Sequence, residues 1–95
     1  EEAFAQNLAN RGRFAEAFAA HEKVIAEARR RLQTFGGTGV DLAYSEMLLG
    51  VTARKAGDRD RACRSWEAAE RGFDRVARQG KLLAFFAAFR PGLQE

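Results

Sequence analysis

The sequence predicts an all-α protein built from antiparallel helical hairpins. Three observations predict this class: Ala, Arg, Glu and Leu are abundant, β-branched residues are scarce, and apolar residues recur at alternating spacings of three and four. The chain has 95 residues, of which 46% are hydrophobic and 31% are charged, so it can bury a core of its own. We therefore expect one domain over residues 1–95, with about five helices and no strands.

The first two helices are predicted on either side of a glycine turn. Phe4 and Leu8 are spaced as on one helical face, and Gly12 can adopt the positive φ that ends a helix. A second helix is predicted over about residues 14–33, and the three glycines within residues 36–39 should end it. The apolar face of this second helix is formed by Phe14, Phe18, His21, Ile25, Ala28, Leu32 and Phe35.

A second hairpin is predicted from two further helices, over about residues 40–56 and 59–78. Gly57 turns the chain between them, and Asp58 is a plausible N-cap for the later helix. Trp66 is expected to fill the space between the helices. Small residues are expected where the two backbones come close, namely Gly50, Ala53, Ala62 and Ala69.

A separate closing helix is expected over residues 81–90. Gly80 should end the preceding helix, and Pro91 should end the closing one. The residues Leu82, Phe85, Phe86 and Phe89 share one helical face. Because burial of these phenylalanines would be strongly favourable, we expect this helix to be docked on the rest of the domain.

The two halves of the chain correspond when the sequence is shifted by 45 residues. This shift pairs Gly12 with Gly57, Ala17 with Ala62, His21 with Trp66, Glu22 with Glu67, and Val24 with Ala69. Such self-similarity indicates a repeat architecture, in which each repeat is one helical hairpin.

The second half resembles a tetratricopeptide repeat. That family places Leu-Gly, a Gly turn, and then Ala, an aromatic residue and Ala along a helical hairpin. The matching residues are Leu49, Gly50, Gly57, Asp58, Ala62, Trp66 and Ala69. The period of 45 exceeds the 34 of the family, and the closing Pro is absent. The resemblance implies two repeats, over residues 1–35 and 40–79, and non-covalent protein binding.

The residues best suited to catalysis are His21 and Cys63, and neither has the partners that catalysis needs. His21 is the single histidine, and we expect it in a seam between helices or at its rim, held by a hydrogen bond. Cys63 lies beside the Ala62–Trp66 face, and we expect a small buried thiol. We therefore expect no enzyme, no cofactor and no metal site.

The best candidate for binding is one face of the helix expected over residues 40–56. In tetratricopeptide-like arrays, the first helix of each repeat lines the groove that takes a partner. On this sequence the groove positions carry Tyr44, Met47, Leu48, Val51, Arg54 and Lys55. The apolar members would anchor a protein or peptide partner, and the basic pair would meet acidic groups. An alternative is that the first and closing helices bury this face.

Two other classes of partner stay open. A small array of hairpins often completes its core by forming a homodimer. A basic nucleic-acid-binding module is disfavoured, because the net charge is only +3 and the outward arginines of residues 59–78 each follow an acid by one turn.

We expect neither a membrane span nor a signal peptide in this sequence. Apolar runs fall short of the roughly 20 residues that cross a bilayer, and no signal peptide opens the chain. Together with the single cysteine, this favours a reducing, cytoplasmic compartment and no membrane association. The chain begins at Glu1 inside a helical pattern, so we expect a fragment of a longer protein.

Overall fold

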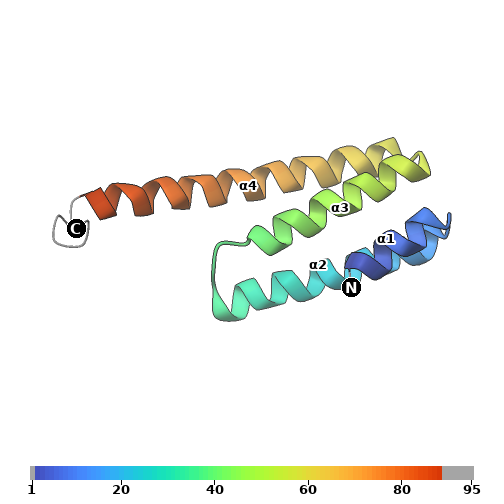
Figure 1. The fold of residues 1–95 in the computed structure, drawn as a ribbon, viewed down its shortest axis with the longest axis horizontal. Coiled ribbons are helices and arrows are strands. Elements are labelled where there is room, and N and C mark those ends of the chain that lie inside the picture. Colours follow the sequence, from blue (N-terminus) through green and yellow to red (C-terminus); the bar gives the residue numbers. More distant parts are fainter. Residues whose placement is uncertain (1, 89–95) are drawn as a thin grey trace.

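The computed structural model describes the backbone of residues 2–88 and the side chains of residues 3–80. This part of the chain contains helices and no strands, so the all-α prediction is confirmed. The helices are α1 (Glu2–Asn10), α2 (Phe14–Phe35), α3 (Val40–Ala56) and α4 (Arg59–Ala88), as Figure 1 shows. The bounds of α3 are those predicted, and α2 ends two residues later than predicted.

The two hairpin turns are built alike. Gly12 and Gly57 have φ angles of 77° and 81°, which glycine adopts at little cost. Three backbone hydrogen bonds recur after a shift of 45 residues. In the first turn they are Gly12 N to Ala9 O, Arg13 N to Leu8 O, and Ala17 N to Arg13 O. In the second turn they are Gly57 N to Arg54 O, Asp58 N to Ala53 O, and Ala62 N to Asp58 O.

The starts of α2 and α4 differ in one respect, the side-chain cap. The carboxylate of Asp58 accepts a hydrogen bond from the backbone N–H of Arg61 at 3.1 Å, so Asp58 caps α4 as predicted. Arg13 holds the same position before α2 and provides no side-chain cap. The Arg13 guanidinium instead pairs with Glu16 at 2.6 Å.

The length of α4 corrects the sequence analysis. The predicted break at Gly80 and the separate closing helix over residues 81–90 are wrong, because α4 continues to Ala88. One glycine costs a helix only about 1 kcal/mol, and the neighbouring Ala, Arg, Gln, Lys and Leu residues favour helix. No N-capping residue follows Gly80 to start a new helix. The end of the predicted closing helix, residues 89–90, lies outside the described residues.

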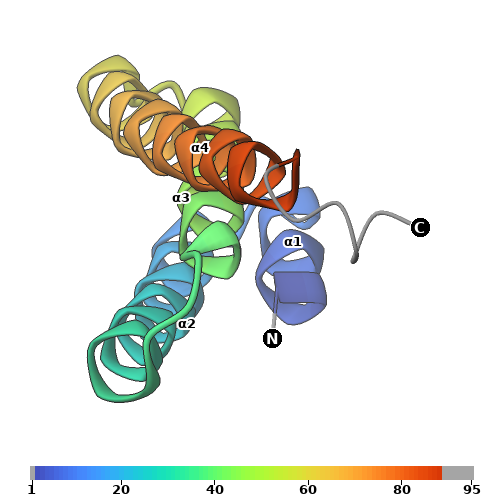
Figure 2. The same ribbon diagram turned by 90° about the vertical axis from the view of Figure 1, so that its left-hand side faces the viewer.

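The helix α3 is the central element. It packs against α4 on one side and α2 on another, and α1 touches its edge (Figure 2). The helix α4 is longer than α3 and projects past it (Figure 1). The buried core consists largely of alanines, which allow the helices to approach closely. Its hydrophobic members are Ala5, Leu8, Ala9, Ala17, Ile25, Ala28, Ala43, Leu49, Ala53, Ala62 and Ala69.

The contact between α3 and α4 is especially close at two glycines. A Cβ added to Gly72 would lie 2.7 Å from the Cβ of Ala43. A Cβ added to Gly50 would lie 3.0 Å from Nε1 of Trp66. The expectation that small residues mark this contact is therefore confirmed at Gly50.

A buried hydrogen bond joins the two hairpins. Nε2 of His21 lies 2.8 Å from Oγ1 of Thr52, and both residues are fully buried. The prediction of a hydrogen-bonded seam histidine is confirmed.

Two other burial predictions need correction. Trp66 packs one edge against Gly50 but leaves 38% of its surface exposed, so it fills the space between α3 and α4 only in part. The prediction that Cys63 is buried is wrong, because Cys63 is exposed and none of the described helices covers this side of α4.

Candidate functional site

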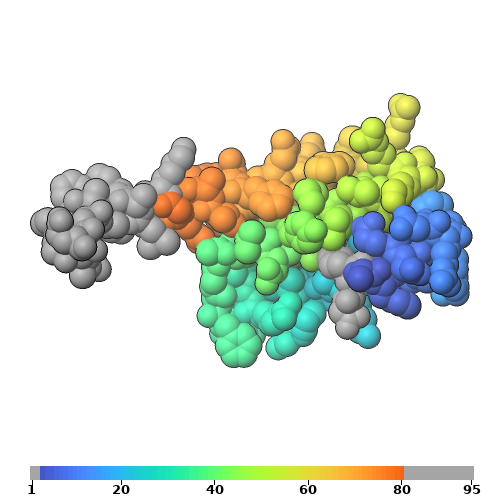
Figure 3. All heavy atoms as spheres, in the orientation of Figure 1, coloured from blue at the N-terminus to red at the C-terminus, as the bar shows by residue number. Residues whose placement is uncertain are grey.

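The six predicted binding residues share one face of α3, which we call the α3 face. It consists of Tyr44, Met47, Leu48, Val51, Arg54 and Lys55. Tyr44 is 50% exposed, Arg54 and Lys55 are exposed, and the other three are half-buried. Figure 3 shows α3 reaching the surface between α4 and α1. The structure therefore brings these residues together on an accessible side of the helix.

The helical register explains why this face stays open. On the side toward α2, Thr52 bonds to His21, and Leu49 is buried. On the side toward α4, Ala43 meets Gly72, and Gly50 meets Trp66. Because successive residues of an α-helix turn by about 100°, these contacts use two of its sides and leave a third unfilled. The apolar composition of α3 is thus only partly explained by the core.

The helix α1 borders the basic end of the α3 face. Nζ of Lys55 donates a hydrogen bond to Oδ1 of Asn10 at 3.0 Å, which holds the ammonium group in place. Arg54 forms no ion pair with any described residue, so its guanidinium can donate hydrogen bonds to a partner's carboxylate. Of the two helices expected to cover this face, α1 lies beside α3 but leaves Tyr44 half exposed, and the predicted closing helix does not exist as a separate element.

A groove of about 280 Å³ lies between α2 and α4, with α3 as its floor. Burial raises the pKa of Glu46 in this region, although Arg29, Arg71 and Arg75 all oppose that rise. The residues that line the groove are Glu22, Ile25, Arg29, Glu46, Leu49, Arg64, Ser65 and Ala68. This cluster was not predicted from the sequence. Its signal was that neither Arg29 nor Arg75 has an acid three or four residues away on its own helix.

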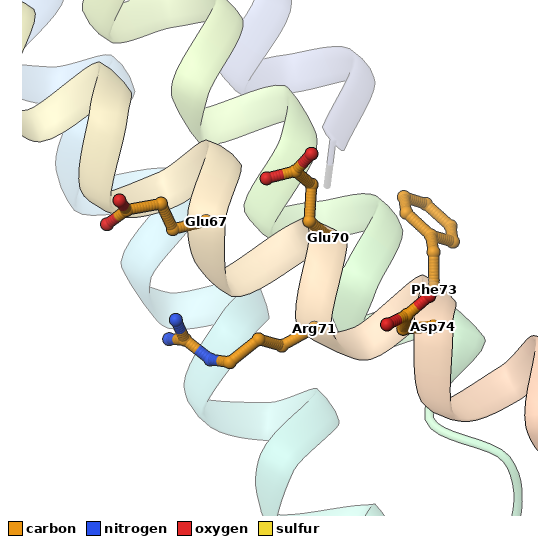
Figure 4. Close-up of a pocket in the computed structure, with 5 residues that line it drawn as sticks. All are labelled: Glu67, Glu70, Arg71, Phe73 and Asp74. Carbon is orange, nitrogen blue, oxygen red and sulfur yellow. The ribbon is translucent and has the colours of Figure 1, made fainter.

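A second hollow, of about 660 Å³, is lined by residues of α4 alone, and we call it the α4 hollow. Its lining is Glu67, Glu70, Arg71, Phe73 and Asp74. In Figure 4, Glu70 and Phe73 extend to one side of α4, whereas Arg71 extends to the other. This surface therefore combines an exposed phenyl ring with three carboxylates and one guanidinium, and its net charge is negative.

The described side chains can also be compared with the needs of metal binding and acid–base chemistry. No group of three or more His, Cys, Asp and Glu residues among them is arranged to hold a metal ion. His21 is buried against Thr52 and so is out of reach of a substrate.

None of the described helices has the length and the hydropathy that crossing a bilayer requires.

No protein-family model, curated protein or solved structure matches this chain.

Proposed function

We propose that this chain is a non-catalytic module that binds a protein or peptide through the α3 face, as a scaffold or adaptor region. The observation that carries the proposal is the exposure of Tyr44 beside the half-buried Met47 and Leu48 on the central helix. Large apolar side chains on an accessible, rigid face are typical of binding surfaces. The helix is fixed by α2 and α4, so little order would have to be created on binding.

The chemistry of the α3 face indicates the kind of partner. An apolar side chain would pack between Tyr44 and Met47, and a carboxylate would pair with Arg54 and Lys55. Lys55 is already held by Asn10, which lowers the entropy cost of using it. The partner is therefore a segment with apolar and acidic residues about two helical turns apart.

The tetratricopeptide-like arrangement is part of this proposal. It is supported by the two turns, whose glycines and hydrogen bonds recur at a spacing of 45 residues. In such an array the first helix of each repeat would line the binding groove, which agrees with the placement of α3.

A selection from a random peptide library, displayed on phage, tests this function. We expect enrichment of peptides with apolar and acidic residues that bind the chain and lose at least about tenfold in affinity to Tyr44→Ser/Met47→Ser, a loss of roughly 1.4 kcal/mol. The matched control is Phe35→Ser, which removes an exposed phenyl ring from the end of α2. Peptides that bind the Tyr44→Ser/Met47→Ser variant as tightly as the unchanged chain would contradict the proposal.

Self-assembly is a second candidate function. It is favoured by a different observation, namely that Phe4, Trp66 and Phe73 are exposed at the two ends of the array.

A further inference from the structure

We propose that the chain assembles head to tail with copies of itself, with α1 of one copy packing on the outer face of α4 in the next. This surface is separate from the α3 face, so the inference goes beyond the proposed binding function and does not depend on it. It follows from comparing residues 45 positions apart. The surfaces that join the two hairpins, one on α2 and one on α3, each have a counterpart in the sequence, on α4 and α1, that no other described residue covers.

The helices α2 and α4 carry corresponding faces, one covered and one exposed. The face of α2 that meets α3 is buried or half-buried, and its members are Phe18, His21, Ile25, Ala28 and Leu32. The residues 45 positions later on α4 are all exposed. We call them the tail face, which consists of Cys63, Trp66, Glu70, Phe73 and Ala77. Trp66 and Phe73 are large apolar side chains at positions whose counterparts, His21 and Ala28, are covered.

The helices α3 and α1 also carry corresponding faces, one covered and one exposed. The helix α3 meets α2 through Leu49 and Thr52, both of them buried. Their counterparts on α1 are Phe4 and Asn7, which we call the head face. Phe4 is 60% exposed, and Asn7 is exposed as well. The head face is therefore an open copy of the surface that α3 uses to dock on α2.

The groove between α2 and α4 gives an independent check. Its α2 residues, Glu22, Ile25 and Arg29, have the counterparts Glu67, Glu70 and Asp74, which line the α4 hollow (Figure 4). Its residues Leu49, Arg64, Ser65 and Ala68 have the counterparts Phe4, Ala19, Ala20 and Lys23. These four line another hollow of about 800 Å³ between α1 and α2. The internal groove thus recurs as two separate halves. One half lies on α4, and the other lies between α1 and α2.

The net charges of the two halves are opposite in sign. The α4 hollow contains three carboxylates and one arginine. The hollow between α1 and α2 contains Lys23, Arg30 and Arg31 along with Glu16 and Glu27. Glu27 is paired with Arg30 within the chain, whereas Lys23 forms no ion pair with a described residue. In the assembly Lys23 would lie opposite the carboxylates of the next copy.

The assembly joins two different surfaces, so it does not close after two copies. Each added copy again presents a free head face and a free tail face, which gives an open-ended series. A symmetric dimer, in contrast, would join one surface to itself and would stop at two chains.

Sedimentation velocity with complementary variants tests the geometry. Phe4→Ser removes the head face, and Trp66→Ser/Phe73→Ser removes the tail face. We expect the unchanged chain to form dimers, trimers and larger species as its concentration rises, and each variant alone to stay monomeric. An equimolar mixture of the two variants should form dimers and nothing larger, because one intact head meets one intact tail.

Several results would overturn the proposal. These are an unchanged chain that is monomeric at every concentration, one that stops at dimers, a variant that still assembles alone, or a mixture that stays monomeric. If the double substitution prevents folding, Glu70→Lys/Asp74→Lys replaces it as the tail variant, since both carboxylates are exposed. Tyr44→Ser should assemble normally, which separates this test from that of the α3 face.

A substitution that should strengthen assembly gives the sharpest check. Within the chain, Arg61 of α4 pairs with Glu22 of α2. The counterparts of these two residues are Glu16 and Glu67, which would repel each other across the junction. Glu16→Arg should therefore tighten assembly about fivefold, the scale of one recovered ion pair.

The matched control for this gain is Asp60→Arg, which changes the charge equally outside both faces. An equal gain from Asp60→Arg, or no gain from Glu16→Arg, would contradict the proposed register.

Discussion

The two hairpins have the same turns, but equivalent positions on their second helices differ in burial. His21 on α2 is fully buried, whereas Trp66, its counterpart on α4, is 38% exposed although its side chain is larger. The reason is that α3 covers α2 at His21, whereas none of the described helices covers the outer side of α4 at Trp66. The burial of a repeated position therefore depends on whether a neighbouring hairpin covers it, and not on the size of its side chain.

The largest effect that we expect concerns the closest contact of the second hairpin. Gly72→Ala would place a Cβ 2.7 Å from the Cβ of Ala43, which has no flexible end that can move aside. We expect the free energy of unfolding to fall by about 2–3 kcal/mol, because overpacking forces the backbones apart. Urea denaturation, followed by circular dichroism, measures the change.

Gly80→Ala is the matched control on the same helix. Nothing lies within 4 Å of a Cβ at this position, so the alanine should instead stabilise α4 by about 1 kcal/mol. Equal effects at the two glycines would show that the α3–α4 contact is looser than described.

The next largest effect concerns the seam between the hairpins. Thr52→Val keeps the shape of the side chain but removes the hydroxyl that faces Nε2 of His21. We expect a loss of about 1–2 kcal/mol, because a buried polar atom is left without this partner. Thermal denaturation measures it, and the equivalent change at an exposed threonine, Thr34→Val, is the control. A loss of stability no greater than that of Thr34→Val would show that this hydrogen bond does not stabilise the fold.

A smaller effect compares the two helix starts. Asp58→Ala should cost about 1 kcal/mol, because it removes the N-cap of α4. Arg13→Asp should stabilise the chain by about 0.5–1 kcal/mol, since it supplies the missing cap to α2 with Glu16 three residues later. Urea denaturation of both variants tests the pair. Losses in both would mean that the two turns are not equivalent.

The smallest effect is a dependence on pH. Because burial raises the pKa of Glu46, the folded chain binds this proton more tightly than the unfolded chain does. Stability is therefore lost as pH rises from the unfolded pKa, about 4.3, through the higher folded value. Glu46→Gln should be more stable than the unchanged chain by about a few tenths of a kcal/mol at pH 7. Denaturation at pH 7 and pH 3.5 checks this, and a difference that persists at pH 3.5 would argue against this cause.

Helix positions could be predicted from the sequence wherever a turn residue was required. Gly12 and Gly57 adopt positive φ, and α3 begins and ends where its flanking glycines predict. Gly80 misled the analysis because a single glycine within good helix formers does not end a helix, and nothing after it starts a new one. Glycine is thus a reliable boundary only where the chain must turn.

The candidate site could be predicted in part. The periodicity of residues 40–56 gave the face that carries Tyr44 and Met47, because that spacing depends on the helix alone. The exposure of Cys63 and Trp66 could not be predicted, since it depends on which elements lie next to α4. For the same reason, the sequence alone did not indicate that Glu46 would lie near arginines from two other helices.

The fluorescence of Trp66, the single tryptophan, tests the central claim most directly. At low concentration the indole should be accessible to acrylamide, and its emission should shift to shorter wavelengths as the concentration rises and a second copy covers it. Phe4→Ser should abolish that shift without altering the spectrum of the dilute protein. An indole that is shielded at low concentration, or a shift that survives Phe4→Ser, would contradict the claim that α4 presents an open copy of the α2 surface.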